Sequence, residues 1–100
     1  MTVPSTPGGA LGIVESVGLV GALEAADAMV KSANVVVTNY KTMRNGQVSI
    51  YVRGDVGAVT AAVNAGAAAA RLVGETAISH VIARPHGETD ELIADATTAI

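Results

Sequence analysis

The sequence predicts one α/β (α+β) domain with the element order β-α-β-β-α-β, in which a four-stranded antiparallel sheet carries both helices on one face. The chain has 100 residues, which is enough for a single hydrophobic core. Its apolar residues fall into short β-branched runs and two longer stretches of helical spacing. Between the two middle runs, Asn45-Gly46 is the strongest short-range signal of a hairpin and makes those strands antiparallel neighbours.

Four runs of residues predict the strands. Residues 10–15 are almost wholly apolar, which is typical of a strand buried on both faces. Residues 35–40 are rich in β-branched side chains, and residues 47–53 alternate between apolar and polar positions. The last strand is predicted over residues 75–83, and Arg84-Pro85 ends it because proline cannot continue a hydrogen-bonded ladder.

Two stretches predict the helices. The first covers residues 18–33, and its expected buried face consists of Leu19, Leu23, Ala26 and Val30. The second follows Asp55, a good N-cap residue, and ends at Gly74, which is typical of the position after a helix. Its stripe consists of Val56, Val59, Val63, Gly66, Ala70 and Val73. Because these side chains are small, this helix is expected to lie close to the sheet or to a neighbour. Together the elements give the ferredoxin-like fold.

The two ends of the chain are expected to differ from the domain at residues 10–86. Residues 1–9 predict a flexible leader, with neither the basic nor the apolar segment of a signal peptide. Residues 87–100 contain four acids and no Lys or Arg, which predicts an acidic tail with a final helix over 90–99. Without that tail the charges nearly balance, so neither nucleic acid nor a membrane is expected as a partner.

The composition points to self-association. Half of the residues are hydrophobic and 15% are charged, against roughly 25% charged residues in an average soluble domain. A small domain exposes much of its surface, so part of the apolar surface is expected to lie against another subunit. The chain has no cysteine, which excludes disulfides and thiolate metal sites and fits a cytoplasmic location.

Residues that could carry chemistry are sparse. His80 and His86 are six residues apart, which is not a metal-ligand spacing. The turn at residues 53–57, Arg-Gly-Asp-Val-Gly, stands between a strand and a helix as phosphate-binding loops do, but its acid would repel phosphate and the loop lysine is absent. No nucleophile elbow occurs, and Glu15 in the first strand has no sequence-adjacent carboxylate with which to share acid–base work. The sequence therefore predicts no enzyme, no cofactor and no metal ion.

Several blocks of the sequence occur together in one known family. The blocks are Ala10-Leu-Gly-Ile-Val-Glu15, Gly18-Leu-Val-Gly-Ala-Leu-Glu-Ala-Ala-Asp-Ala-Met-Val-Lys-Ser-Ala-Asn34, Val52-Arg-Gly-Asp-Val-Gly-Ala-Val59, Ala65-Gly-Ala-Ala-Ala-Ala-Arg71 and His80-Val-Ile-Ala-Arg-Pro-His86. In their order and length they resemble the single-domain, hexamer-forming shell proteins of bacterial microcompartments. The resemblance covers about residues 10–86 and is specific at the level of the family.

The resemblance implies a flat cyclic hexamer that tiles into the facets of a protein organelle. It places Lys31 at the outer edge of the hexamer, where the lysines of two neighbouring tiles pack antiparallel. Asn34 supports this contact, Arg84 reaches across the edge, and Pro85 and His86 complete the matching Arg-Pro-His motif. Lysine suits this place because its apolar stem can lie along the partner while its ammonium reaches carbonyl oxygens.

The resemblance also places the hairpin around a sixfold pore through which metabolites pass, with Met43, Arg44, Asn45 and Gly46 at its tip. The family usually has Lys-Ile-Gly-Ser-Gly or a close variant, where this chain has Thr42-Met-Arg-Asn-Gly46. Arg44 replaces a glycine, so the pore is expected to differ from the ordinary one. Six Arg44 side chains at the axis would make a narrow, positive opening that favours anions; alternatively they fold outward over the surface.

The function predicted from the sequence is therefore that of a structural, non-catalytic shell tile in the cytoplasm. Its expected partners are further copies of itself, other microcompartment shell proteins and small metabolites in the pore. The first predicted helix and its end at residues 30–34 are more similar to the shell proteins of catabolic compartments, or metabolosomes, than to those of carboxysomes. The alternative is a homo-oligomer that binds or senses a small molecule on the same fold, without assembly into sheets.

Overall fold

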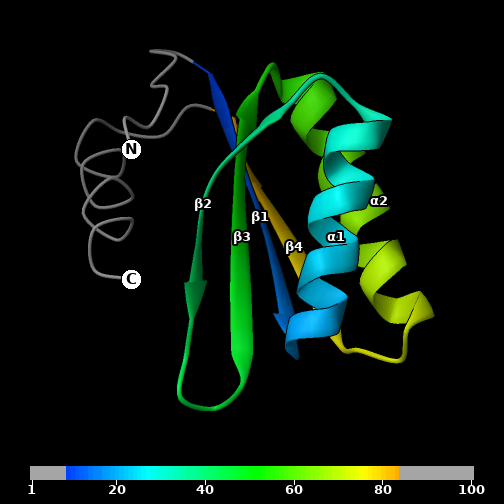
Figure 1. Ribbon diagram of the computed structural model, residues 1–100. Helices are drawn as coiled ribbons and strands as arrows, with labels where there is room; N and C mark the ends of the chain where they lie inside the picture. The colour runs from blue at the N-terminus through cyan, green and yellow to red at the C-terminus, as the bar shows by residue number, and fades with distance from the viewer. Residues whose placement is uncertain (1–8, 84–100) are drawn as a thin grey trace.

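The computed structural model describes residues 9–83, which form six elements (Figure 1). They are β1 (Ala10–Val17), α1 (Leu19–Ser32), β2 (Val36–Thr42), β3 (Gln47–Gly54), α2 (Val56–Leu72) and β4 (Ala77–Ile82). The predicted leader up to residue 8, the Arg84-Pro85-His86 motif, and the acidic tail with its helix all lie outside the described residues.

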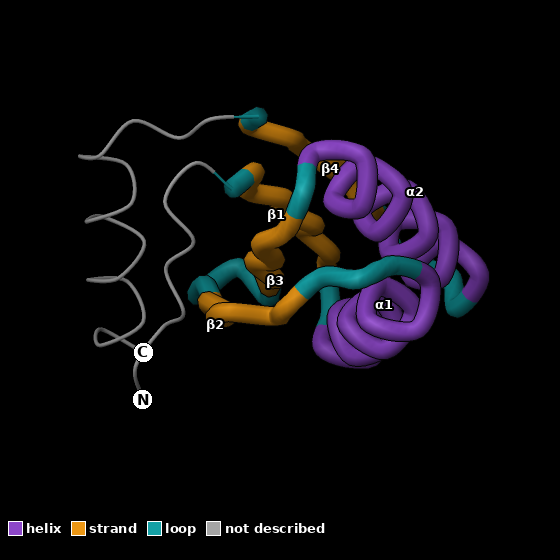
Figure 2. The backbone as a smooth tube through the Cα atoms, turned by 90° about the horizontal axis from the view of Figure 1, so that it is seen from above, coloured by secondary structure: helices purple, strands orange, loops and turns teal. Residues whose placement is uncertain are grey.

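The sheet has the strand order β2-β3-β1-β4, and all of its pairings are antiparallel. Both helices cover the same face, with α1 on the side of β2 and α2 on the side of β4 (Figure 2). This is the predicted split βαβ arrangement, and the prediction of fold class is confirmed. A β-bulge between Val37 and Asn39 interrupts the regular pairing of β2 with β3.

Small residues bring the helices close to the sheet and to each other. A Cβ atom added at Gly12 of β1 would lie 2.6 Å from Cγ1 of Val63 and 2.7 Å from Cγ1 of Val59, both on α2. At the contact between the helices, a Cβ atom on Gly66 would lie 2.7 Å from Cγ of Met29. The core is therefore built mainly from Ala and Val, with Ile50 on the sheet and Met29 filling the space beside Gly66.

The prediction of the buried face of α1 is wrong. The buried residues are Gly21, Ala22, Ala25 and Met29. The larger side chains Leu19, Leu23 and Val30 are exposed, Leu23 by 60%. The smaller face lies inward because α1 approaches its neighbours closely, and bulky leucines would hold it away from them. An apolar stripe is thus left on the outside of the helix.

Helix α2 ends before Gly74, as predicted, and the residues that complete its C-terminus make β4 begin later than predicted. Gly74 has φ +84°, its N–H donates to Arg71 O at 3.0 Å, and the N–H of Glu75 donates to Ala70 O at 3.1 Å. These two bonds form a Schellman motif. Because Gly74 and Glu75 complete the helix, β4 begins at Ala77 and not at residue 75.

Replacing Gly12 tests the close packing of the sheet against α2. Gly12→Ala is expected to lower the free energy of unfolding by about 1–3 kcal/mol, because the added methyl group meets three valine side chains. Gly57→Ala is the matched control, since nothing lies within 4 Å of a Cβ atom there and alanine is the better helix former. Thermal unfolding followed by circular dichroism gives the comparison; equal midpoints for Gly12→Ala and the wild type would contradict the packing.

Candidate functional site

The tip of the β2–β3 hairpin is exposed but held in one conformation by hydrogen bonds. The N–H of Met43 donates to Gln47 O at 2.8 Å, and the N–H of Gly46 donates to Met43 O at 3.1 Å. The Asn45 side-chain oxygen accepts from the N–H of Gln47 at 3.1 Å. Gly46 takes φ +83°, and no other residue type among those described has a positive φ. The turn is therefore of the three-residue kind that closes with glycine in the left-handed region.

The hairpin tip is also fixed to the body of the domain. The N–H of Gly18, just before α1, donates to Gly46 O at 3.0 Å. The start of α1 and the tip of the hairpin consequently lie at the same end of the molecule (Figure 1). A side chain at the tip has a defined position relative to the helical layer, although its solvent exposure is high.

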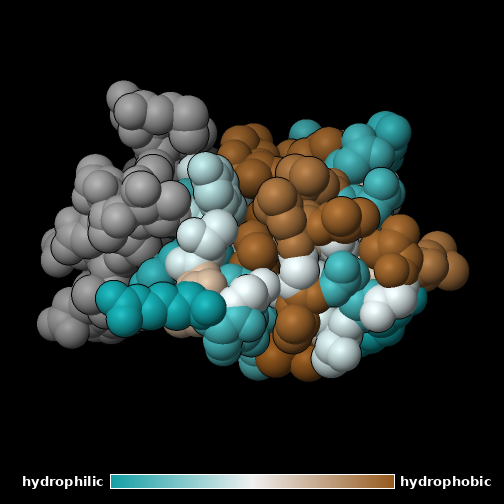
Figure 3. Space-filling view, turned by 60° about the horizontal axis from the view of Figure 1, so that its bottom comes forward, coloured by the Kyte–Doolittle hydropathy of each residue, from teal (hydrophilic) through white to brown (hydrophobic). Residues whose placement is uncertain are grey.

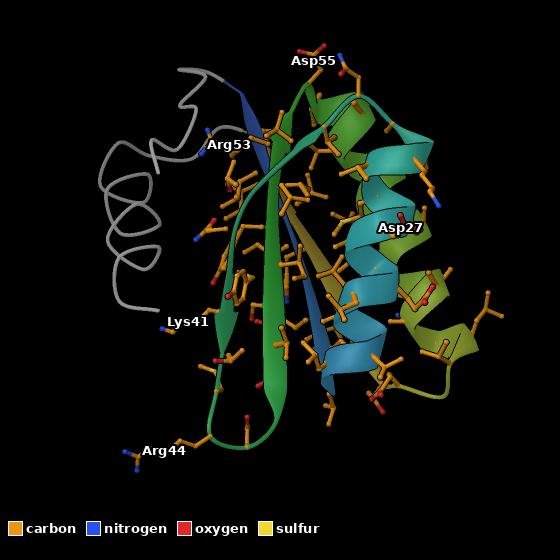
Figure 4. All side chains as sticks on the ribbon, viewed as in Figure 1. Asp27, Lys41, Arg44, Arg53 and Asp55 are labelled. Atoms are coloured by element: carbon orange, nitrogen blue, oxygen red, sulfur yellow. The ribbon has the colours of Figure 1, made fainter. Side chains whose placement is uncertain are left out.

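Two cations project from this hairpin, Arg44 at the tip and Lys41 near the end of β2. Both point away from the helices, as Figure 4 shows. Residues 38–52 contain no Asp or Glu, and neither cation has an ion-pair partner in the described part of the chain. The hairpin is thus a local positive region in a chain of net charge −3. The sequence analysis did not identify Lys41 as a candidate site residue. The absence of Asp and Glu from residues 38–52 could have identified it, because it leaves both hairpin cations without a nearby counter-ion.

The opposite end of the molecule holds Lys31 and Asn34. Lys31 is in the last turn of α1, and its Nζ lies 2.8 Å from Oδ2 of Asp27, one turn earlier. The hydrogen bond with Asp27, and then its charge, raise the pKa of Lys31 above the ordinary value, so the ammonium stays charged. The i,i+4 spacing of the two residues already indicated this pair.

Asn34 stands in the loop between α1 and β2, and its backbone lies close to the end of β3. It is exposed, and its backbone oxygen would lie 3.0 Å from a Cβ atom added at Gly54. Seven steps of about 3.3 Å along β3 separate Gly54 from Gln47, the first residue after the hairpin tip, by roughly 23 Å. The residues predicted for the pore and for the tile edge therefore lie at opposite ends of the domain, and the structure does not bring them together.

Two apolar patches lie on opposite flanks of the domain. The α1 flank patch consists of Leu19, Leu23 and Val30 together with Tyr40 of β2. The β4 flank patch lies on the other edge strand and consists of Ile78 and Ile82 on one face of the strand and Val81 on the other. All seven side chains are exposed. Figure 3, which brings the hairpin end forward, shows a broad apolar area over the helical layer. An exposed apolar area of this kind is typical of a surface that another protein covers.

Two of the residues considered for chemistry, His80 and Asp55, lie within the described residues 9–83. His80 is exposed on β4, and no three His, Asp or Glu side chains in this part of the chain form a group that could hold a metal ion. Asp55 is the N-cap residue of α2, but its side chain makes no capping hydrogen bond. Neither described helix is long and apolar enough to cross a membrane.

The family model for the BMC domain matches residues 10–85, which include all six elements. The chain belongs to the BMC-domain family. A bacterial microcompartment shell protein, PduA from Citrobacter freundii, is 58% identical over 84 residues, covering 84% of this chain and 90% of that protein. A second BMC relative, the bacterial microcompartment shell protein EutM from Salmonella typhimurium, is 51% identical over 83% of this chain and 86% of its own length.

A solved structure agrees with the family. The crystal structure of a microcompartment protein from Desulfitobacterium hafniense DCB superposes with a TM-score of 0.76 and 30% sequence identity over 91% of this chain. Our chain spans 50% of that longer protein. The match to the BMC domain and to named shell proteins decides between the two function classes that the sequence predicted, in favour of a structural shell protein.

Proposed function

We propose that this chain is a non-catalytic tile of a bacterial microcompartment shell. Six copies form a ring, rings join edge to edge into facets within the cytoplasm, and small metabolites cross at the centre of each ring. The observation that carries the proposal is the BMC-domain match over residues 10–85. Two relatives, PduA and EutM, support a compartment of the catabolic, or metabolosome, type.

The two flank patches support ring formation. Contacts between the same patch on both partners make closed dimers, whereas contacts between two different patches make rings or open filaments. The α1 flank patch and the β4 flank patch lie on opposite sides of one subunit, so each copy offers one patch to each of two neighbours. This head-to-tail arrangement is the one that a cyclic hexamer needs.

The two ends of the domain support the division between pore and edge. In the proposed ring the hairpin tip surrounds the axis, and the far end with Lys31 and Asn34 forms the perimeter. Arg84, Pro85 and His86 are proposed for the same perimeter. Contacts there join a tile to further copies and to other shell proteins, because the edges of different tiles must match.

Arg44 gives the proposed pore its charge. Nothing on the hairpin neutralises it, since the nearest charged side chain of the hairpin is another cation, Lys41. Positive charges gathered around a narrow opening raise the local concentration of anions and lower that of cations. We propose that small polar or anionic metabolites pass, with Met43, Asn45 and Gly46 completing the rim.

Leu23→Glu tests the ring. A carboxylate buried without a partner in the contact between subunits is expected to weaken association by at least about a hundredfold, leaving monomers at micromolar concentration. Leu23→Met keeps an apolar side chain of similar volume and is the matched control. Native mass spectrometry should give six chains for the wild type and for Leu23→Met; six chains for Leu23→Glu would place the contact elsewhere.

Lys31→Asp separates the edge contact from the ring. Lys31 follows Val30 of the α1 flank patch, but its side chain is 73% exposed and pairs with Asp27, not with an apolar residue of the patch. Rings are therefore expected to persist while sheets disappear. Electron microscopy of the assembled protein and native mass measured on the same sample give both readouts. Sheets of unchanged extent in the variant would refute the role of Lys31 at the tile edge.

Arg44→Gly tests the pore. Removing six positive charges from the rim is expected to reduce the preference for anions over cations at least about threefold, since an unscreened charge at a narrow opening acts directly on the passing ion. The measurement is the reversal potential of rings inserted in a planar bilayer under a salt gradient. Arg44→Lys, which keeps the positive charge at the same position, is the control. Equal selectivity in Arg44→Gly and the wild type would show that the side chain does not face the axis.

A further inference from the structure

We infer that Asp27 is a positioning residue for the contact between tiles: it neutralises and orients Lys31 so that two such lysines can meet across a tile boundary. The inference rests on the proposed function, because it assumes that Lys31 lies at the edge. What it adds is a further edge residue that the resemblance does not provide, and a reason why like charges can be brought together there.

The geometry leaves the pair available to a neighbour. Nζ of Lys31 and Oδ2 of Asp27 are 2.8 Å apart, yet the lysine side chain is 73% exposed and the aspartate side chain 55% exposed. Figure 4 shows Asp27 on the outer side of α1, directed away from the sheet. The pair is thus part of the outer surface of the helix and does not contribute to the core.

The ammonium keeps donors for a partner. A lysine ammonium has three N–H donors and no acceptor. Asp27 is the one hydrogen-bond partner of Lys31 among residues 9–83, so two donors remain for carbonyl oxygens of the neighbouring tile. The ion pair with Asp27, one turn earlier on α1, also holds the aliphatic part of the Lys31 side chain along the helix. Forming the tile contact then costs less side-chain entropy, because the side chain is already ordered.

Charge explains why the aspartate matters. Two edge lysines brought together without counter-ions repel each other, and at about 8 Å in water this repulsion lowers an association constant roughly two- to threefold. With Asp27 beside each lysine, the boundary holds two positive and two negative charges and has no net charge. Glu24, one turn earlier, also acts on Lys31 through its charge, but forms no ion pair with it. No cation of α2 or the sheet pairs with Asp27 in the described residues.

The test compares Asp27→Asn with Glu24→Gln, which removes the same charge from the same helix but leaves the lysine pair intact. The quantity measured is the protein concentration at which rings assemble into sheets, by light scattering and electron microscopy, at low and at high salt. An exposed helix pair contributes little to folding, so both variants are expected to form rings. Asp27→Asn is expected to raise the threshold roughly two- to threefold at low salt, and Glu24→Gln is expected to change it by less than Asp27→Asn does.

Salt distinguishes charge neutralisation from a general loss of structure. The deficit of Asp27→Asn is expected to disappear near 0.5 M salt, where exposed charges are screened within a few ångströms, whereas a misfolded variant would not recover. Equal thresholds for the two variants at low salt, in a wild type that forms sheets, would overturn the inference alone. A wild type that forms rings and no sheets would overturn the proposed tile and this inference with it.

Discussion

The close approach of two helices to a four-stranded sheet is the constraint on which the rest of this structure depends. Gly12 and Gly66 allow contacts that any larger residue would prevent, so the interior fills with alanine and valine. Leu11, Met29 and Ile50 are buried, but many of the other large apolar residues are left outside, and Leu19, Leu23 and Leu72 all lie on the surface, Leu72 by 87%. The flanks of such a subunit are apolar because the helices and the sheet pack so closely that few large apolar side chains fit between them. Association with further copies completes a burial that one copy alone leaves unfinished.

The sequence was sufficient to predict the order and type of the elements, since hydrophobic periodicity and the Asn-Gly turn are local signals. It failed at the face of α1. Two stripes of helical spacing exist on that helix, one with Leu19, Leu23 and Val30 and one with Gly21, Ala22, Ala25 and Met29. The rule that the more hydrophobic stripe is buried favours the first. The rule fails here because the choice depends on how near the neighbouring elements lie, and that distance is set by glycines on other elements, far away in the sequence.

The candidate site, too, could be predicted from the sequence only in part. The Asp27–Lys31 pair and the glycine that closes the hairpin follow from spacing within one element, and both could be predicted. The separation of hairpin and helix end, and the common direction of Arg44 and Lys41, depend on the register of the whole sheet and on the bond from Gly18 to Gly46. The end that faces the ring axis is defined by contacts between chains. In a single chain, this orientation is supported by the apolar flank patches and by the resemblance to the family.

The arrangement also separates three tasks within a small domain. In the proposed tile, the flanks serve closure of the ring, the hairpin end serves the pore, and the end of α1 serves the boundary between tiles. The hairpin and the end of α1 lie far apart and share no contacts, so substitutions at these two sites act almost independently on free energies. A shell built from such tiles can therefore change the charge of its pore, as we propose for Arg44, while the edge that must fit other tiles stays the same. The strand length that separates Gly54 from the hairpin by roughly 23 Å is what makes this independence possible, because screening in physiological salt cancels most interaction between charges beyond about 8 Å.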